Sequence, residues 1–391
     1  MNKYYVYYET NDKNFRVLYD DDRFETLIHK PKETTYHHFE LFKGYECSDD
    51  GLLKFRADMI RWDDELKSND VLSIDYFKYY SHFHAVELTF KRLCKGKYED
   101  FEKIDATESR WIESTHNGGL NYCYSGEHQS YGWDFSSFYP TNMGEYNFIM
   151  PHKRGVEHCL DVMPSDIQLG FYRVKITSDH MHATKMFAFC KTHTYTSISL
   201  KHAIELQDDF NFKIDLIVDG KPNAYIYPKG IRASKVFGVW CDRLVKIKMQ
   251  FPKNKLIKHL LSSLHGSLSR SNNLIKTGDE IEKEKLKVST DNNSDYKIIE
   301  YTYNDDKESY TLQSMIEPYR YNFRLKSFLT AFGRVKISEV ALTNLDAVVR
   351  IHTDGIVFNR DVKLKFPLLI REDKTTGFLK WENANRYSNL L

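Results

Sequence analysis

The sequence predicts an α+β fold, because strand-like and helix-like segments alternate along its 391 residues. Two stretches rich in β-branched and aromatic residues, Tyr4–Tyr8 and Gly170–Ile176, are typical of strands. Apolar residues recur at helical spacing in four longer segments, which are 55–66, 236–250, 253–269 and 323–340. A chain of this length can bury a large core and is expected to hold more than one structural unit.

Composition sets only broad limits on function. The formal net charge is +1, so no global basic surplus indicates nucleic acid, although a local cluster of Lys and Arg in a cleft could still bind it. The six cysteines are scattered without a Cys-x-x-Cys pair, which argues against a zinc ribbon or disulfide framework and for a reducing compartment. No apolar run is long enough to span a membrane, and no signal-peptide pattern is present. We therefore expect a soluble, intracellular protein without a membrane partner.

The stretch from Tyr131 to Met143 is the feature around which the rest of the chain is interpreted. Its alternating large residues predict a strand that ends at Asp134, and Tyr139-Pro140 predicts a turn after it. A carboxylate at the open edge of a sheet can bind Mg²⁺, and N–H groups freed by a turn can bind phosphate oxygens. An ordinary buried strand that ends in a turn would show the same pattern, so this stretch alone leaves both interpretations open.

Two further motifs follow in order. The first is Lys258-His-Leu-Leu-Ser262-Ser-Leu-His265-Gly266, in the second of two helical segments separated by Pro252, and the second is Arg350-Ile-His352-Thr-Asp354-Gly355. With Asp134-Phe-Ser-Ser137-Phe-Tyr139-Pro140, they resemble the three polymerase motifs of family B DNA polymerases. The second and third family motifs read Lys-x3-Asn-Ser-x-Tyr-Gly and Tyr-x-Asp-Thr-Asp-Ser. Three matches in order across more than half of the chain make the resemblance specific, and it is greatest to the protein-primed branch of viruses and linear plasmids.

The resemblance implies a right-hand polymerase architecture. A palm, made of an antiparallel sheet with helices, and two-helix fingers would follow a small α/β remnant of a 3′–5′ exonuclease. The implied boundaries are 1–105 for the exonuclease-like domain, 106–230 for the first part of the palm with an insertion, 231–269 for the fingers, 270–316 for a β-hairpin insertion and 317–391 for the second part of the palm. The family's primer-clamp motif and thumb do not appear before Leu391. We therefore expect the thumb to be absent and the grip on DNA to be weak and salt-sensitive.

The resemblance also implies a role for each motif residue. The implied catalytic residues are Asp134, Asp354 and Lys258; the metal contacts, for Mg²⁺ or Mn²⁺, are Asp134, Phe135 and Asp354; the nucleotide contacts are Ser137, Phe138, Tyr139, Lys246, Ser262 and His265; and the DNA contacts are Gly118, Gly119, His352 and Lys380. The implied partners are a DNA template-primer and deoxynucleoside triphosphates, with a terminal protein or a thumb-supplying chain as further candidates. Gly118 and Gly119 follow His116-Asn117, and this loop is similar to one that touches the template in the family. A plain hairpin turn uses paired glycines equally well.

The N-terminal region matches the exonuclease pattern only in outline. Tyr7, in Val6-Tyr-Tyr-Glu9, and His84, in a helical segment, stand where the family has carboxylates. Two-metal phosphodiester hydrolysis needs several carboxylates that converge on the ions. We therefore expect a remnant without proofreading activity.

Two hairpins and one helix complete the secondary-structure prediction. Residues 212–218 and 224–228 predict a hairpin around Asp219-Gly220, and residues 296–303 predict another with 309–313. The second hairpin lies where protein-primed polymerases carry an insertion that encloses DNA, although a surface excursion without function is the alternative. The helix at 323–340 is expected to have Phe328, Ala331 and Val335 on its apolar side and Lys326 and Arg334 on the other.

The motif substitutions leave more than one function open. His352 replaces the first aspartate of the third motif, while Ser262 for Asn, His265 for Tyr and Gly355 for Ser are milder changes. The expected function is template-directed DNA polymerisation, in which deoxynucleotides are added to a 3′ or protein hydroxyl by two-metal phosphoryl transfer. The alternative is a catalytically silent polymerase-like subunit that binds nucleic acid or a partner. An RNA polymerase or reverse transcriptase would need different residues at the sugar site.

Overall fold

The computed structural model describes residues 3–28, 36–115, 118–290, 294–304 and 307–389. The chain divides into two compact units. Unit 1 comprises residues 1–98 and 234–267, and unit 2 comprises residues 99–233 and 268–391. The five-part division expected from the motifs stays a prediction. None of the helices in the described ranges has the length and apolar character needed to cross a membrane.

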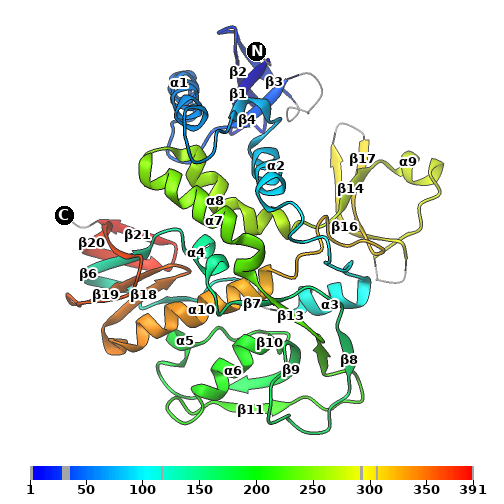
Figure 1. Ribbon diagram of the computed structural model, residues 1–391, viewed down its shortest axis with the longest axis vertical. Helices are drawn as coiled ribbons and strands as arrows, with labels where there is room; N and C mark the ends of the chain where they lie inside the picture. Colours follow the sequence, from blue (N-terminus) through cyan, green and yellow to red (C-terminus); the bar gives the residue numbers. More distant parts are fainter. Residues whose placement is uncertain (1–2, 29–35, 116–117, 291–293, 305–306, 390–391) are drawn as a thin grey trace. The chain divides into compact units, whose positions relative to one another are not determined.

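Unit 1 contains a four-stranded sheet and four α-helices among its described residues (Figure 1). The strand order is β3-β2-β1-β4, in which β1 pairs parallel with β4 and the other neighbours are antiparallel. The elements are β1 (Tyr4–Glu9), β2 (Phe15–Tyr19), β3 (Phe24–Leu27), β4 (His37–Glu40), α1 (Asp49–Lys67), the 3₁₀ turn η1 (Tyr76–Lys78), α2 (His82–Cys94), α7 (Ala233–Gln250) and α8 (Lys255–Leu268). The strand predicted at Tyr4–Tyr8 and the helix predicted at 55–66 are thus confirmed.

Helices α7 and α8 confirm the two helical segments predicted on either side of Pro252. The residues expected on one face of α7 are all buried, and they are Phe237, Trp240, Leu244 and Ile247. Asn254 caps α8, because its Oδ1 accepts the N–H of Ile257 at 3.2 Å. The Asn254 side chain also donates to the carbonyl of Trp62 on α1 at 3.0 Å, so the cap ties α8 to α1.

Two buried imidazoles lie in the core of unit 1. The ring of Phe42 stacks on both His82 and His259, at centroid distances of 4.5 and 5.3 Å. His82 also bonds the hydroxyl of Tyr76 at 3.0 Å through Nδ1 and the carbonyl of Glu40 at 2.9 Å through Nε2. Burial lowers the pKa of His82 to about 3 and the pKa of His259 to about 4, so both rings are neutral in the folded protein near pH 7.

We expect unit 1 to lose stability when the pH falls below about 6.5. The folded-state pKa values are lower than the unfolded one, so in this range the unfolded chain binds protons that the folded chain does not. Each such histidine would then cost about 1.4 kcal/mol of unfolding free energy per pH unit, until the folded pKa is reached. Denaturant titrations between pH 7 and 4.5 should show a smaller loss in His259→Phe than in the unchanged protein. The exposed His158 provides the matched control, and an equal effect of His158→Gln would contradict the assignment.

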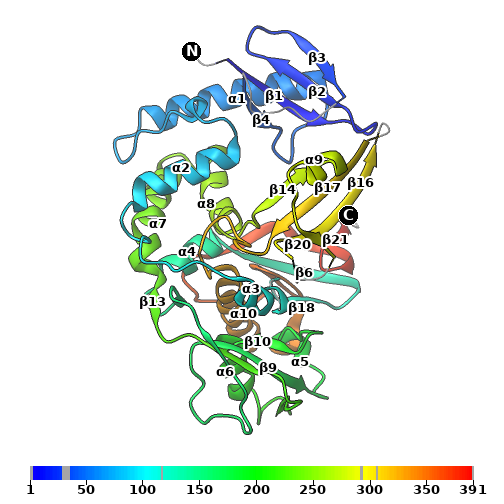
Figure 2. The same cartoon turned by 90° about the vertical axis from the view of Figure 1, so that its right-hand side faces the viewer.

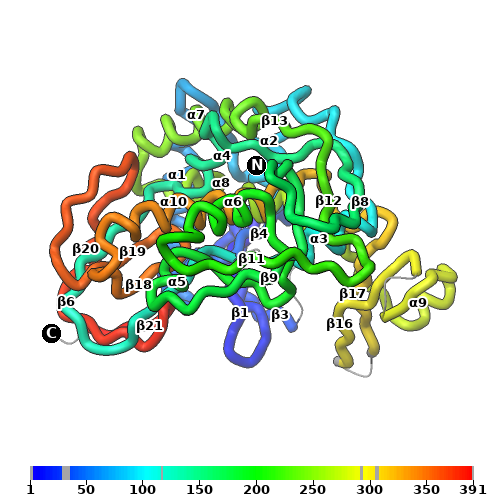
Figure 3. Tube along the Cα trace, turned by 90° about the horizontal axis from the view of Figure 1, so that it is seen from below, coloured from blue at the N-terminus to red at the C-terminus, as the bar shows by residue number. Residues whose placement is uncertain are grey.

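Unit 2 contains a six-stranded antiparallel sheet that carries Asp134 (Figures 1 and 3). Its strand order is β21-β20-β6-β19-β18-β5. The strands are β5 (Asn121–Cys123), β6 (Gly126–Phe135), β18 (Val348–His352), β19 (Gly355–Phe358), β20 (Leu369–Asn383) and β21 (Arg386–Asn389). The hairpin predicted at 348–358 is confirmed by the antiparallel pairing of β18 with β19.

One face of this sheet packs into the main core of unit 2. Ile351, Ile356 and Phe358 belong to the same buried cluster as Ile337 and Val340 of helix α10 (Lys326–Leu342). Ile356 and Phe358 pair with the residues of β6 that alternate with Asp134 and Gly132. Asp134 and Gly132 therefore lie on the face opposite to the core. The carboxylate is therefore directed away from the core because of strand alternation alone.

A second sheet, whose central strand β9 (Gly170–Thr177) is labelled in Figure 2, contains both segments of a predicted hairpin, and its pairing shows that this hairpin is wrong. Residues 213–216 and 224–226 form strands, but each pairs antiparallel with β9 and they do not pair with each other. Asp219 instead forms a bidentate pair with Arg173 on β9, at 2.6 and 3.0 Å. The segments lie one after the other beside β9, and the Asp219-Gly220 stretch connects them. A turn signal gives no information on which strand each segment will pair with.

The remaining elements of unit 2 are α3 (Ala106–Ser114), α4 (Phe138–Gly144), β7 (Ile149–Pro151), β8 (Val156–His158), α5 (Ala183–Met186), β10 (Thr194–Thr196), α6 (Ser197–Glu205), β11 (Lys213–Leu216), β12 (Ala224–Ile226), β13 (Gly230–Arg232), β14 (Asn273–Lys276), α9 (Gly278–Lys283), β15 (Val288–Ser289), β16 (Tyr296–Asn304), β17 (Lys307–Ser314) and η2 (Leu345–Ala347). They include the other strands of the second sheet, which are β8, β10, β11 and β12. The hairpin predicted near 296–313 is confirmed as β16 and β17, within a four-stranded sheet of order β14-β17-β16-β15.

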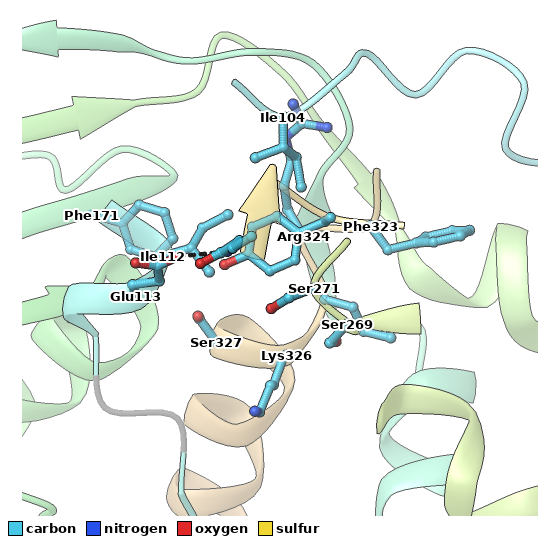
Figure 4. Close-up of a pocket in the computed structure, with 13 residues that line it drawn as sticks. Ile104, Ile112, Glu113, Phe171, Ser269, Ser271, Phe323, Arg324, Lys326 and Ser327 are labelled. Atoms are coloured by element: carbon cyan, nitrogen blue, oxygen red, sulfur yellow. Dashed lines mark hydrogen bonds between the residues drawn. The ribbon is translucent and has the colours of Figure 1, made fainter. Parts of the chain in front are cut away.

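A fully buried ion pair between Arg324 and Glu108 lies beside a cavity in unit 2, and Figure 4 shows Arg324 among the residues that line this cavity. Arg324 donates to both carboxylate oxygens of Glu108, at 2.6 and 2.8 Å, and both side chains are 0% exposed. The hydroxyl of Tyr227 donates to the same carboxylate at 2.8 Å. The cavity of about 310 Å³ is lined by Arg324 together with residues of α3, β17 and the first turn of α10. This pair joins α3 to the segment that leads into α10.

Candidate functional site

Asp134 and Asp354 come together at the ends of neighbouring strands in unit 2. Asp134 is the penultimate residue of β6 and lies opposite Gly355, the first residue of β19. The N–H of Phe135 donates to the carbonyl of Asp354 at 3.0 Å, which fixes the two strand ends side by side. A Cβ built on Gly355 would stand 3.3 Å from Oδ1 of Asp134, so glycine here leaves room for that carboxylate. The two acids that the motifs singled out are thus adjacent in the fold.

The turn that carries Asp354 is held in an unusual conformation. Thr353 has φ of 60°, in the left-handed region that β-branched residues rarely adopt. The N–H of Thr353 donates to the carbonyl of Leu120 at 3.0 Å. Any Cβ on Gly119 would approach Oγ1 of Thr353 to 2.6 Å, so only glycine permits this contact. Gly119 therefore packs directly against the turn that carries Asp354, while His116 and Asn117 lie outside the described residues.

After Asp134 the chain turns earlier than predicted. Ser137 has φ of 55° and is the N-cap residue that precedes helix α4, so the turn falls at Ser136–Ser137. Tyr139 and Pro140 are instead helical residues of the first turn of α4, where proline is well tolerated. The predicted turn at Tyr139-Pro140 is therefore wrong. The signal was correct in kind, because the N–H groups of a helix's first turn have no acceptor within that helix.

Tyr139 interacts electrostatically with Asp354 and with a buried arginine. Its ring contacts Gly333 of α10, where any Cβ would stand 3.4 Å from the tyrosine ring and 2.9 Å from Phe138. Burial, and secondarily the charge of Asp354, raise the pKa of Tyr139 to about 12. Its hydroxyl therefore stays protonated near neutral pH.

Arg334 is the buried arginine, and its placement corrects the sequence prediction. It was expected on the charged outer side of α10, yet it is only 7% exposed. Its guanidinium donates to the carbonyl of Gly118 and, at 3.1 Å, to Oγ of Ser199. Burial lowers the pKa of Arg334 to about 10. Helical periodicity placed Arg334 on the polar side of the helix. It could not reveal the hydrogen-bond acceptors that this side chain finds inside the core.

Asp354 lies in an electrostatically crowded environment. Burial, with a smaller contribution from the charge of Glu372, raises its pKa above the ordinary value. Burial and the nearby Arg350 lower the pKa of His352, which lies on the same sheet face as Asp134 because it pairs with Gly355. Burial disfavours the ionised form of a carboxylate, and a cation placed next to the carboxylate stabilises that ionised form.

Three charged residues near the acids were not predicted as site residues. Arg350 lies opposite Val357, and Glu372 lies opposite Gly132, so both occupy the sheet face of Asp134. Lys374 pairs with Glu372, with Nζ 2.7 Å from Oε1. The sequence offered no usable signal for the last two, because the run 371–374 has the composition of a solvated surface segment.

The remaining predicted residues are not all brought to this site. Lys246, Lys258 and Ser262 are exposed on α7 and α8, and His265 is half-buried on α8. Lys258, Ser262 and Gly266 follow one another at intervals of four residues and share one exposed side of α8. These residues belong to unit 1, so their role beside Asp134 stays a prediction. Lys380 pairs with Glu127 and therefore lies on the other face of the sheet from Asp134.

The two acids provide a donor set suited to a hard divalent cation. Among the described residues, no group of three or more His, Cys, Asp or Glu side chains is arranged to hold a metal ion. Mg²⁺, however, commonly binds through one or two carboxylates together with waters and substrate phosphates. Asp134 and Asp354 are therefore compatible in ligand type and number with a Mg²⁺ or Mn²⁺ ion.

Solved structures with a similar fold exist, although no protein-family model and no curated protein match the sequence. Phi29 DNA polymerase complexed with primer-template DNA and incoming nucleotide substrates matches with a TM-score of 0.57 and 13% identity, over 87% of this chain and 59% of that one. Its post-translocation binary complex with primer-template DNA gives 0.53 and 13%, over 86% and 57% of the two chains. Its complex with single-stranded DNA gives 0.52 and 11%, over 86% and 56%.

At these identities the likeness concerns the fold. The chain has a mixed α+β fold similar to that of a DNA polymerase. The DNA polymerase with the similar fold is that of phi29. This chain spans 59% of the phi29 polymerase chain in the complex that has the highest TM-score of the three.

Proposed function

We propose that this chain is a template-directed DNA polymerase, which adds deoxynucleotides to a 3′ or protein hydroxyl by two-metal phosphoryl transfer. The observation that carries the proposal is the convergence of Asp134 and Asp354 at adjacent strand ends, in a fold similar to that of phi29 DNA polymerase. In-line phosphoryl transfer needs carboxylates at the metal ions and cations for the charge on the leaving pyrophosphate. A Mg²⁺ or Mn²⁺ ion held by these acids would supply charge neutralisation there.

The other parts of the chain take roles consistent with this proposal. The six-stranded sheet with α10 would be the palm, and α7 and α8 the fingers. Lys258 would meet the triphosphate, and Lys246, Ser262 and His265 would flank it. The four-stranded sheet of unit 1 would be the exonuclease remnant, and the sheet of β16 and β17 the insertion against DNA. Arg334 would hold the Gly118–Gly119 loop close to the acids through its bond to the Gly118 carbonyl.

Primer extension on a short template with Mg²⁺ or Mn²⁺ tests the proposal. Incorporation of the templated deoxynucleotide is expected. Binding of primer-template without incorporation, under either ion, would overturn the polymerase proposal in favour of a catalytically silent subunit. The substitution of His352 for the motif's first aspartate is the feature that makes this second outcome informative.

Tyr139 is expected to discriminate against ribonucleotides. A rigid ring held by Phe138 and Gly333 beneath the sugar would leave no room for a 2′ hydroxyl. Tyr139→Ala should raise the ratio of ribo- to deoxynucleotide incorporation by about tenfold or more, the effect expected when a pocket wall is removed. Tyr139→Phe keeps the ring and is the matched control. An unchanged ratio in Tyr139→Ala would remove this role and reopen the RNA polymerase interpretation.

A further inference from the structure

The cavity beside the Glu108–Arg324 ion pair is a second candidate site (Figure 4). Its volume of about 310 Å³ lies in the range of small-ligand pockets. The described residues that line it all belong to unit 2, and they include members of α3, β9, β17 and the first turn of α10. Neither Asp134 nor Asp354 is among them, so this cavity is separate from the site of the two acids.

The ion pair gives the cavity a wall without free donors. The guanidinium of Arg324 donates to both oxygens of Glu108 at 2.6 and 2.8 Å. It also donates to the backbone carbonyls of Glu102, Asn322 and Lys103, at 2.7, 3.0 and 3.4 Å. These contacts engage all five N–H donors of a guanidinium. Arg324 therefore shapes the cavity but does not bind an anionic ligand in it.

Two side chains offer hydrogen-bond acceptors to a ligand in the cavity. Glu113 on α3 accepts hydrogen bonds from Ser109 and Gln313, at 2.9 and 3.2 Å, and both bonds reach Oε1, which leaves Oε2 as an acceptor. Gln313 on β17 is only 6% exposed, and its amide nitrogen faces the carboxylate. Its amide oxygen is therefore the second acceptor, and the pair favours a ligand with two neighbouring N–H groups.

The other lining residues favour a flat, apolar ligand that has an anionic end. Aromatic side chains among the described residues of the lining are Phe171, Tyr319 and Phe323, and aromatic faces stack well on nucleobases. Lys326 is exposed at the edge of the cavity, and its ammonium points away from Glu113 (Figure 4). A phosphate outside the cavity could pair with this ammonium while the base lies inside.

The acceptor pair distinguishes among the nucleobases. On its Watson–Crick edge guanine carries two neighbouring donors, N1–H and the exocyclic N2–H. Adenine and cytosine each carry a ring acceptor beside their exocyclic amine, and the N3–H of thymine lies between two carbonyl oxygens. An acceptor that faces Glu113 or Gln313 would leave a polar group unpaired, which costs binding free energy.

We propose that this cavity binds the base of a guanine nucleotide, with N2–H donated to Glu113, N1–H donated to Gln313 and the phosphate beside Lys326. A free guanine nucleotide and a guanine in single-stranded DNA share this chemistry. The inference goes beyond the proposed function and does not require polymerase activity.

Calorimetric titration of the unchanged protein with dGMP, dIMP and dAMP is the first test. EDTA in the buffer removes divalent cations, so no metal ion at Asp134 and Asp354 attracts the phosphate. The base of dIMP lacks only the exocyclic amine of guanine, and dAMP presents a ring acceptor in place of N1–H. We expect dGMP to bind about tenfold or more tightly than either, the effect of a hydrogen bond to a charged group. Equal affinities for the three nucleotides would overturn the inference.

Glu113→Gln tests the assigned contact. The variant should weaken dGMP binding by about tenfold and leave dIMP binding nearly unchanged. Glu317→Gln is the matched control, because Glu317 is an exposed acid of the same unit that does not line the cavity, and it should change neither affinity. A merely structural role of Glu113 would weaken both nucleotides equally. The comparison of dGMP with dIMP on the unchanged protein decides the question even if this variant does not fold.

A single-stranded probe identifies the source of the base. Oligothymidylate with one central dG is compared with oligothymidylate alone, on the unchanged protein and on Glu113→Gln. A preference for the dG strand that Glu113→Gln removes would assign the cavity to a base of single-stranded DNA, and a preference for dGMP alone would assign it to the free nucleotide. No guanine preference with either probe overturns the inference.

Primer extension separates this inference from the proposed function. Absence of extension together with an intact guanine preference would refute the polymerase proposal alone. Normal extension without a guanine preference would refute the guanine site alone.

Discussion

Replacing Asp354 by alanine is expected to lower nucleotide addition by about a thousandfold without lowering the free energy of unfolding. The side chain would be a metal contact in the proposed reaction, and its burial already disfavours the ionised form. Removing a carboxylate that is unfavourably placed in the folded state should therefore not destabilise the protein. Single-turnover primer extension and a denaturant titration measure the two effects. Asp134→Ala should behave similarly in the first assay.

Two controls define the outcome for Asp354. Asp361→Ala removes an exposed acid of the same unit and should leave nucleotide addition unchanged. His352→Ala should retain measurable activity, because histidine already occupies the position of the motif's first aspartate. An inactive His352→Ala together with an active Asp354→Ala would mean that the motif register is wrong by two residues.

Replacing Arg324 by methionine is expected to lower the free energy of unfolding by about 3–5 kcal/mol, because Glu108 would be left as an uncompensated buried charge. Both side chains are fully buried, and burial raises the pKa of Glu108 even beside the guanidinium. Methionine fills much of the arginine's volume, so packing loss contributes less than the unpaired charge. Denaturant-induced unfolding followed by circular dichroism measures the change.

A double-mutant cycle isolates the charge effect at this ion pair. Arg324→Met combined with Glu108→Leu should lose much less stability than the two single changes together, since neither charge then remains unpaired. The exposed pair of Lys103 and Glu317 is the matched control, and Lys103→Ala should cost less than about 1 kcal/mol. Additive effects of the two buried substitutions would show that packing, and not the ion pair, stabilises this region.

Local features of the fold were predictable from the sequence because they depend on neighbouring residues. Helical periodicity identified α1, α7, α8 and α10, and β-propensity identified β1, β9 and the β16–β17 hairpin. The motif order also predicted that Asp134 and Asp354 would meet, and the pairing of β6 with β19 brings them together. For the helices and strands the information lies within a few residues of the element, whereas the meeting of the two acids was implied by the resemblance of the motifs to a family.

Strand partners and buried polar contacts could not be predicted in this way. The segments at 213–216 and 224–226 pair with β9 because a sheet edge is available there, which no turn signal reveals. Arg334 is buried because the Gly118 carbonyl and Ser199 accept its hydrogen bonds from segments more than a hundred residues away. Local polarity predicts exposure, and only the tertiary structure supplies the compensating partners.

The sequence by itself determined the two acids, the strand that ends at the first and the hairpin that carries the second. Only the tertiary structure decided the charge environment of those acids. Arg350 and Glu372 share the sheet face of Asp134 because of the register in which β18 pairs with β19 and β20 pairs with β6, and Lys374 forms an ion pair with Glu372. Electrostatic interactions depend on distance in space, and the pairing of strands far apart in sequence sets that distance.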